Sequence, residues 1–112
     1  MDNEINNLKS LFIKLYNMIV NQDDDFKYTT EKFIRQIIYL LEVYNEDSSS
    51  EYETEIKRVY EDLYSLRGGL TDFFFWDNNF EKREKMNMDL ENLKKEISIL
   101  MKKLFYKEKE QN

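Results

Sequence analysis

Apolar side chains recur every three or four residues in four stretches of the chain, which is the spacing of one face of an α-helix. The first stretch predicts a helix from about Asn3 to Asn21, apolar on more than one side and therefore packed against two neighbours. The second stretch predicts a helix that Thr29 or Thr30 caps and that ends near Tyr44.

The remaining two stretches predict a third helix after a polar loop and a fourth helix in the last part of the chain. Ser50 with Glu53 forms a capping box for the third helix, and Ser48 with Glu51 offers a competing one. The fourth helix is expected to begin within residues 80–87 and to continue to about residue 106.

The segment 67–78, called the aromatic segment below, interrupts the helical pattern. It holds both glycines of the chain, its only tryptophan and three consecutive phenylalanines. Gly68 or Gly69 is well placed to end the third helix in a left-handed C-cap, and Asp72 or Thr71 would then hydrogen-bond the amides of the turn. So many consecutive apolar residues cannot all face one side of a helix or strand. We expect an irregular segment whose phenylalanines fill the bundle between the third and fourth helices.

Four amphipathic helices with short connections predict an all-α fold, an up-down antiparallel bundle with the aromatic segment between helices three and four. The chain has 112 residues, the size of one domain, so residues 1–112 are expected to form a single helical domain. Proline is absent and glycine occurs only twice, so the commonest helix breakers are nearly missing.

The residue inventory argues against catalysis. The chain has no histidine and no cysteine, which excludes Ser-His-Asp and Cys-His arrangements and zinc sites with those ligands. Gly68 and Gly69 lack the lysine and spacing of a phosphate-binding loop. The aspartates at 23–25 lack the alternating ligands of an EF-hand and are expected to be a solvated helix end. We expect no enzyme, no cofactor and no metal; an enzyme that relies on carboxylates alone is a minor alternative.

Charge is distributed unevenly along the chain. The net charge is −6, with sixteen acids against eight bases in residues 1–80 and seven acids against nine bases in residues 81–112. The acidic part argues against direct nucleic-acid binding and favours a basic protein partner; the alternative is an acidic surface that serves solubility alone. The first residues do not resemble a signal peptide, and no apolar run is long enough for a membrane span, so a cytoplasmic protein without membrane contact is expected.

Aromatic residues are abundant, with eight tyrosines, eight phenylalanines and one tryptophan. Most tyrosines fall on or beside apolar helix faces, where their rings would pack at the edge of the core. The alternative is an interface, in which tyrosine and tryptophan are common anchors. Acidic residues interleave with tyrosines in the third helix, and the aromatic segment ends in Trp-Asp-Asn. The predicted partner-binding residues are Glu51, Tyr52, Glu53, Glu55, Tyr60, Glu61, Asp62, Tyr64, Asp72, Trp76, Asp77 and Asn78, with Gly68 and Gly69 as a structural turn.

The second half of the chain resembles a family of small, uncharacterised bacterial helical proteins, some of them encoded in toxin–immunity gene neighbourhoods. The resemblance covers roughly residues 33–105 and departs from the family at Leu70-Thr71, where a turn richer in glycine and serine is expected. It implies a helical fold and an association with toxin neutralisation. The matching positions are Ile38, Leu40, Leu41 and Glu42, then Gly68, Gly69, Asp72, Phe73 and Phe74, and finally Asn87, Leu90 and Leu93.

The hypothesis favoured by these features is an inhibitory protein-binding protein. Its most concrete form is a bacterial immunity protein that neutralises a cytotoxic toxin domain, for example a nuclease, through an acidic, tyrosine-rich surface. One alternative is a structural or adaptor bundle that self-associates through helix one or helix four, and a homodimer is compatible with inhibition. Another is a phage-encoded inhibitor of a host defence nuclease.

Overall fold

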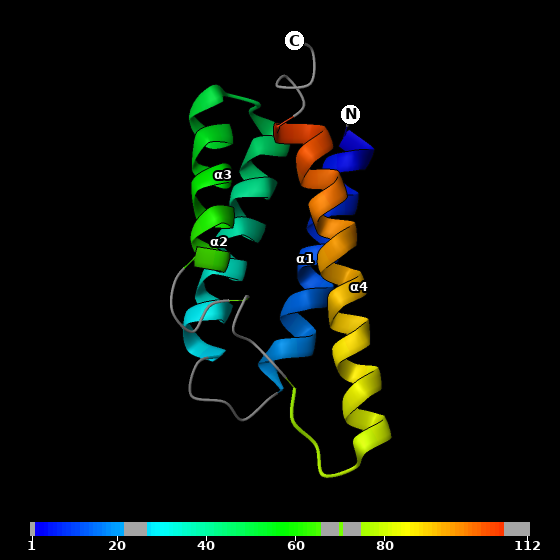
Figure 1. Ribbon diagram of the computed structural model, residues 1–112. Coiled ribbons are helices and arrows are strands. Elements are labelled where there is room, and N and C mark those ends of the chain that lie inside the picture. The colour runs from blue at the N-terminus through cyan, green and yellow to red at the C-terminus, as the bar shows by residue number, and fades with distance from the viewer. Residues whose placement is uncertain (1, 22–26, 66–69, 71–74, 107–112) are drawn as a thin grey trace.

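Four antiparallel helices make up the computed structural model, which describes residues 2–21, 27–65, 70 and 75–106 (Figure 1). The helices are α1 (Asp2–Val20), α2 (Lys27–Glu46), α3 (Ser50–Ser65) and α4 (Phe80–Phe105). α1 and α3 run in one direction and α2 and α4 in the other, as the colour gradient shows (Figure 1). The all-α, up-down bundle expected from the hydrophobic periodicity is confirmed.

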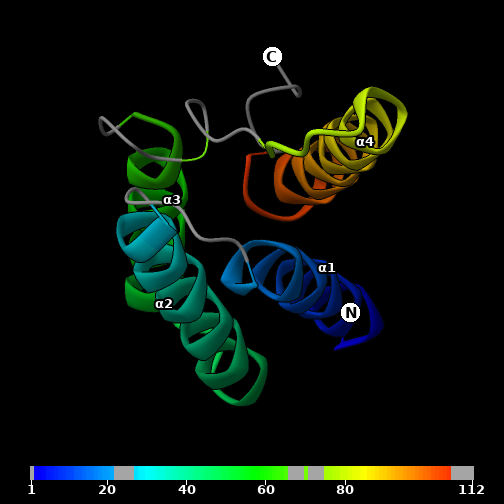
Figure 2. The same ribbon diagram turned by 90° about the horizontal axis from the view of Figure 1, so that it is seen from below.

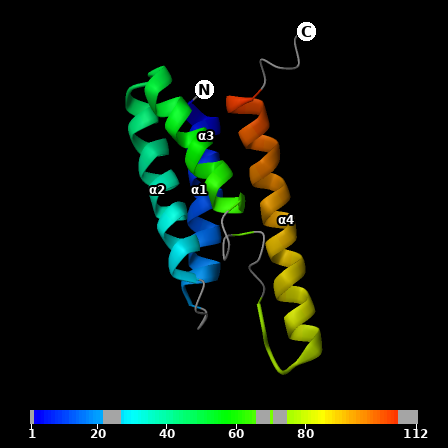
Figure 3. The ribbon, with the colours of Figure 1, turned by 60° about the vertical axis from the view of Figure 1, so that its left-hand side comes forward.

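The bundle is open on one side. α1 packs against both α2 and α4, as its broad apolar surface predicts, and α2 packs against α3. The backbones of α3 and α4 barely approach each other, and the two helices stand apart in the view from below and in the side view (Figures 2 and 3). Side chains from both helices line a groove between α3 and α4.

α4 is the longest helix, with 26 residues against 16 in α3. Its first turns extend beyond the ends of the other three helices (Figures 1 and 3). An end that projects in this way has fewer helical neighbours to cover it, so its side chains are more exposed than those nearer the centre.

The core draws on all four helices and on the connection between α3 and α4. Leu70 and Phe75, which belong to that connection, are as deeply buried as the helical core residues. The expectation that aromatic residues of this segment enter the bundle is thus confirmed for Phe75. The buried apolar residues of the helices are Ile5, Leu8, Phe12, Leu15, Ile19, Ile34, Ile37, Leu40, Leu41, Ile56, Val59, Leu63, Leu90, Leu93, Ile97, Met101 and Phe105.

Two of the predicted helix caps are wrong. Thr29 and Thr30 lie inside α2, because that helix already begins at Lys27, and Thr30 is buried. The cap of α3 is neither Ser50 nor Ser48. Ser49 accepts from the backbone N–H of Tyr52 through its hydroxyl (3.4 Å) and from that of Glu53 through its carbonyl (3.2 Å), the two bonds that define an N-cap residue.

Several predicted features lie outside the described residues. These are the C-cap at Gly68 and Gly69, the turn contact of Asp72, and the burial of Phe73 and Phe74. Within the described part of the chain, no helix has both the length and the apolar character needed to cross a membrane.

Candidate functional site

A cluster of exposed aromatic and apolar side chains lies where the aromatic segment joins α4. Trp76 is 66% exposed, Phe80 58% and Met88 62%, unusually high values for such large apolar groups. Together they border a hollow of about 560 Å³. The residues around this hollow are called the Trp76 patch below, and exposed apolar patches are characteristic of interaction sites. The residues of the patch are Trp76, Phe80, Arg83, Glu84, Asn87 and Met88.

Asn87 holds the backbone of Phe75, near the end of the aromatic segment, against α4. Its Oδ1 accepts from the backbone N–H of Phe75 at 2.9 Å, and its Nδ2 donates to the carbonyl oxygen of Phe75 at 3.0 Å and to that of Arg83 at 3.0 Å. One side chain thus hydrogen-bonds both backbone groups of a residue that lies outside the helices. Because Phe75 is buried, the adjacent Trp76 side chain is directed to the outside.

Arg83 connects the two exposed rings. Its guanidinium carbon lies 4.4 Å from the centre of the Trp76 ring and 5.1 Å from the centre of the Phe80 ring. Both distances are within the range of cation–π attraction, so the arginine restricts the motion of two aromatic rings that solvent surrounds. Rings held in this way lose less side-chain entropy when a partner covers them.

The turn before α4 uses one of the predicted contact residues for its own structure. Asp77 accepts from the backbone N–H of Asn79 at 2.8 Å and lies 3.6 Å from the Lys82 ammonium. Asn79 is the N-cap of α4 and accepts from the N–H of Lys82 at 3.0 Å. Of the predicted Trp76-Asp77-Asn78 contact, Trp76 and Asn78 are exposed, whereas Asp77 is half-buried in the turn.

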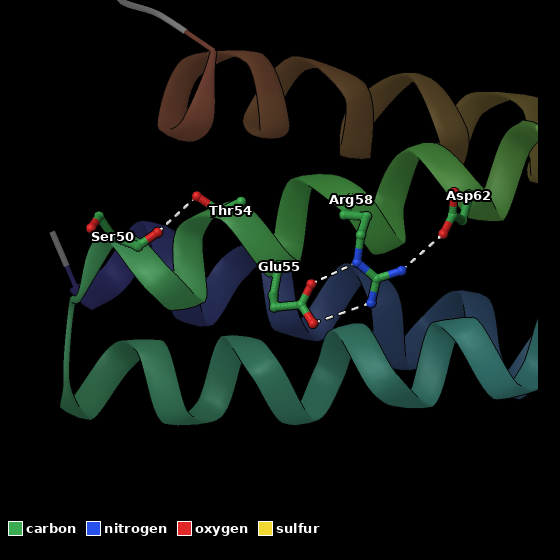
Figure 4. A network of polar contacts seen from close by, with 5 residues as sticks. All are labelled: Ser50, Thr54, Glu55, Arg58 and Asp62. Carbon is green, nitrogen blue, oxygen red and sulfur yellow. Dashed lines mark hydrogen bonds and ion pairs between the residues drawn. The ribbon is translucent and has the colours of Figure 1, made fainter.

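The acidic residues predicted on α3 divide between two faces. Glu55 and Asp62 lie on the face away from α4 and share one arginine, Arg58 (Figure 4). The Arg58 guanidinium donates to both oxygens of Glu55, at 2.6 and 3.2 Å, and to Asp62 at 3.1 Å. These hydrogen bonds lower the pKa of Glu55 below its ordinary value. The carboxylates of Glu55 and Asp62 are therefore already paired with Arg58. Glu51, which is exposed on the same face, has no ion pair within the described chain.

The other face of α3 borders a groove toward α4. The groove has a volume of about 410 Å³, and Tyr60, Glu61 and Tyr64 line it from α3. The side chains that α4 and the end of α3 add to it are Ser65, Glu91, Lys94, Lys95 and Ser98. The structure thus brings the tyrosines and Glu61 together in one groove and leaves Glu55 and Asp62 outside it.

Each predicted residue on this side of α3 also has a contact within the chain. Glu61 accepts a hydrogen bond from the Tyr106 hydroxyl at 2.8 Å, and Glu53 lies 3.9 Å from the Lys57 ammonium. Tyr52 is half-buried and packs against the core. The available acidic surface of α3 is consequently smaller than the count of carboxylates in the sequence indicates.

The groove tyrosines pack by their ring edges. The Tyr60 ring centre lies 6.3 Å from that of Phe12 and 5.3 Å from that of Tyr64, both in edge-to-face arrangements. Burial is the main cause that raises the pKa of both tyrosine hydroxyls above the ordinary value of 10.0. The rings lie at the edge of the core as expected, but their hydroxyls are partly buried and hydrogen-bond each other instead of lying in water.

These raised pKa values predict that the bundle loses stability in alkaline solution. Above pH 10 the unfolded chain releases tyrosine protons that Tyr60 and Tyr64 retain in the fold, so the free energy of unfolding falls as the pH rises. Below that pH the protonation of these tyrosines is the same in both states. Denaturant unfolding followed by circular dichroism at a series of pH values measures the effect.

Matched variants locate this alkaline effect. Tyr64→Phe removes one of the retained protons and is expected to flatten the decline of stability with pH. Tyr39→Phe, which removes the hydroxyl of an exposed ring on α2, is the control for the loss of a tyrosine. A free energy of unfolding that stays constant as the pH rises above 10 would contradict the proposed role of burial.

Five residues of the Trp76 patch were not predicted from the sequence as contact residues: Phe80, Arg83, Glu84, Asn87 and Met88. The spacing of Phe80 and Arg83, three positions apart in a helix, was the available signal for their proximity. The sequence drew attention to Asn87 only through the family resemblance. Its hydrogen bond to Phe75 spans twelve residues, so no local pattern reveals it.

Comparisons with protein-family models, with curated proteins and with solved structures found no match to this chain. The family resemblance of the second half therefore stays a prediction. In the described part of the chain, no three acidic, histidine or cysteine side chains gather in a way that could hold a metal ion.

Proposed function

We propose that this chain is an inhibitory protein-binding protein that contacts its partner through the Trp76 patch. The observation that carries the proposal is a tryptophan that is 66% exposed and yet held in place from two sides. Asn87 hydrogen-bonds the backbone of Phe75, the residue before Trp76, and the Arg83 guanidinium stacks on the Trp76 ring. Tryptophan and arginine are the residues most enriched among binding hot spots.

The charge of the chain supports a basic partner. The net charge of −6 attracts a basic protein over several ångströms and raises the rate of encounter. Domains that act on nucleic acids commonly carry such basic surfaces. The most concrete form of the proposal is an immunity protein that covers the substrate site of a cytotoxic nuclease domain. A phage-encoded inhibitor of a host defence nuclease would bind through the same contacts. The partner recovered would distinguish this form of the proposal from an immunity protein.

Affinity purification from the native host with three baits tests this proposal. The baits are the unchanged chain, Trp76→Ala and Tyr39→Ala, the last of which removes an exposed ring of similar accessibility (62%) from α2. We expect the unchanged chain and Tyr39→Ala to recover one basic nuclease or toxin domain in stoichiometric amount. Trp76→Ala is expected to weaken binding to that partner by roughly 30-fold or more, since hot-spot residues contribute at least about 2 kcal/mol.

Two results would overturn the proposal. One is recovery of the chain alone or with scaffold proteins only. The other is equal binding of the partner by Trp76→Ala and Tyr39→Ala. The electrostatic part is tested separately with the purified partner, because the association rate is expected to fall as salt rises from low to physiological concentration. An association rate that does not depend on salt would remove charge attraction from the mechanism while leaving the Trp76 contact intact.

A further inference from the structure

α4 carries a row of exposed residues along the side away from its buried face. Two of them, Glu84 and Met88, also belong to the Trp76 patch, and two others, Glu91 and Lys95, also border the groove toward α3. The residues of the row follow one another at steps of three and four positions, the spacing of a seam between two packed helices. Met88 and Ile99 are the apolar members, 62% and 66% exposed. The row, called the α4 seam below, consists of Glu84, Met88, Glu91, Lys95, Ile99 and Lys102, all exposed.

The seam is nearly symmetric in composition about its centre. Glu84 and Lys102 are equally distant from residue 93, and so are Glu91 and Lys95. In each pair an acid on the N-terminal side of the centre corresponds to a base on the C-terminal side. Met88 and Ile99 are likewise equidistant from a point between residues 93 and 94. In an identical helix lying parallel and in register, each of these charges would meet a like charge, whereas an antiparallel helix places an opposite charge at every one of them.

We propose that α4 pairs in antiparallel orientation with α4 of a second copy of this chain. In this two-fold arrangement Met88 of each copy packs against Ile99 of the other. Glu84 then meets Lys102, and Glu91 meets Lys95, with every contact occurring twice because a two-fold interface is self-complementary. The charges fix both the direction and the register, as charges flanking a coiled-coil seam do.

The ion pairs within one copy leave most of the seam charges available. Within the described chain, Glu84, Lys95 and Lys102 have no ion pair, and Glu91 has one, to Lys94 at 3.0 Å within the same helix. The seam also lies on the side of α4 away from its buried residues Leu90, Leu93 and Ile97. Pairing therefore requires no rearrangement of the bundle.

A single pair of helices with two apolar contacts is smaller than a standard protein interface, so the dimer is expected to be weak. Sedimentation equilibrium over protein concentrations up to about 1 mM should show reversible dimerisation with a Kd in the micromolar to millimolar range. A monomer throughout that range would overturn the proposal. Ile99→Asp should abolish the dimer, whereas Ile13→Asp on α1, which changes another exposed isoleucine (39%), should leave it unchanged.

Disulfide trapping tests the orientation, because the chain contains no cysteine of its own. Met88→Cys mixed with Ile99→Cys should give a mixed disulfide under mild oxidation, since these positions face each other. Either variant alone should react poorly, because its two copies of the new thiol are about 16 Å apart along the helix, well beyond disulfide reach. The mixed product should exceed that from Met88→Cys with Ile13→Cys by roughly tenfold; equal yields would contradict the antiparallel register.

A charge exchange tests the pairing of Glu84 with Lys102. Lys102→Glu places two acids opposite each other at both ends of the seam and should weaken association by roughly three- to tenfold. The double variant Glu84→Lys with Lys102→Glu should restore it, and failure to do so would overturn the assigned pair. Circular dichroism melting of each variant verifies that the bundle is intact. Glu84 and Met88 belong to both the seam and the Trp76 patch, whereas Ile99 belongs only to the seam and Trp76 only to the patch. Ile99→Asp therefore tests the dimer, and Trp76→Ala tests partner binding, independently of each other.

Discussion

Replacement of Phe75 by alanine is expected to lower the free energy of unfolding by about 3–5 kcal/mol, the usual effect of removing a buried phenylalanine ring. Phe75 is only 1% exposed and joins the core although it belongs to no helix. Loss of the ring would leave a cavity where the open side of the bundle meets α4. A loss of this size is a large part of the 5–15 kcal/mol that stabilises a typical small protein.

The neighbouring residue is the control for this prediction. Trp76→Ala removes an even larger ring that is 66% exposed and stacks on Arg83, so the expected loss is about 1 kcal/mol or less. Denaturant unfolding followed by circular dichroism compares the two variants without relying on tryptophan fluorescence. Losses of similar size for Phe75→Ala and Trp76→Ala would contradict the assignment of one ring to the core and the other to the surface.

Asn87→Ala is expected to lower the free energy of unfolding by about 1–3 kcal/mol. The variant removes the hydrogen bonds that the Asn87 amide makes with the backbone N–H and carbonyl of Phe75, and the loss of hydrogen bonds to partly buried backbone groups costs about this much. The aromatic segment should also loosen on α4. We therefore expect the tryptophan emission of Asn87→Ala to change in the folded state, because Trp76 is the only tryptophan and adjoins the released residue.

Asn92→Ala is the matched control, since Asn92 is an exposed asparagine of the same helix whose side chain makes no hydrogen bond in the described chain. It should change stability by no more than about 0.5 kcal/mol, as is usual at exposed positions without special contacts. If both asparagine variants behave alike, the contact between Asn87 and Phe75 does not hold the segment. If Asn87→Ala also binds the protein partner more weakly than its stability explains, the fixed position of Trp76 contributes to binding.

Three variants distinguish the support of the Trp76 patch from its contact with a partner. Phe75→Ala and Asn87→Ala act on the support of the Trp76 patch, whereas Trp76→Ala acts on the exposed surface itself. A stability measurement should detect mainly the first two, and a binding measurement mainly the third. This division makes the proposed contact role of Trp76 testable apart from the folding of the bundle.

The features of this fold that could be predicted from sequence are those caused by residues within a few positions of one another. Apolar residues three and four positions apart, such as Ile34, Ile37 and Leu41, share one helix face whatever the rest of the chain does. The helices and their alternation in direction therefore followed from periodicity and short connections. The helix caps were harder to predict, because Ser48, Ser49 and Ser50 are chemically equivalent. Only the path of the backbone selects Ser49 as the N-cap of α3.

The predicted contact surface was divided by tertiary structure. The sequence placed acids and tyrosines together on α3, but only the positions of the neighbouring helices decide which of them face a groove. Tyr60 and Tyr64 face α4, whereas Glu55 and Asp62 lie on the other side with Arg58. A carboxylate one turn away from an arginine forms a pair locally, so the acidity of a stretch of sequence overstates the charge that a partner meets.

By itself, the sequence determined the helical bundle, the break at the aromatic segment and the absence of histidine and cysteine chemistry, because each depends on composition or on neighbours within one or two turns. The tertiary structure alone decided that Phe75 enters the core while Trp76 points outward. That choice depends on Asn87, twelve positions farther along the chain, whose side-chain amide hydrogen-bonds both backbone groups of Phe75. Adjacent rings of similar hydrophobicity cannot be told apart by local pattern, and only the packing of the whole bundle assigns one to the core and one to the surface.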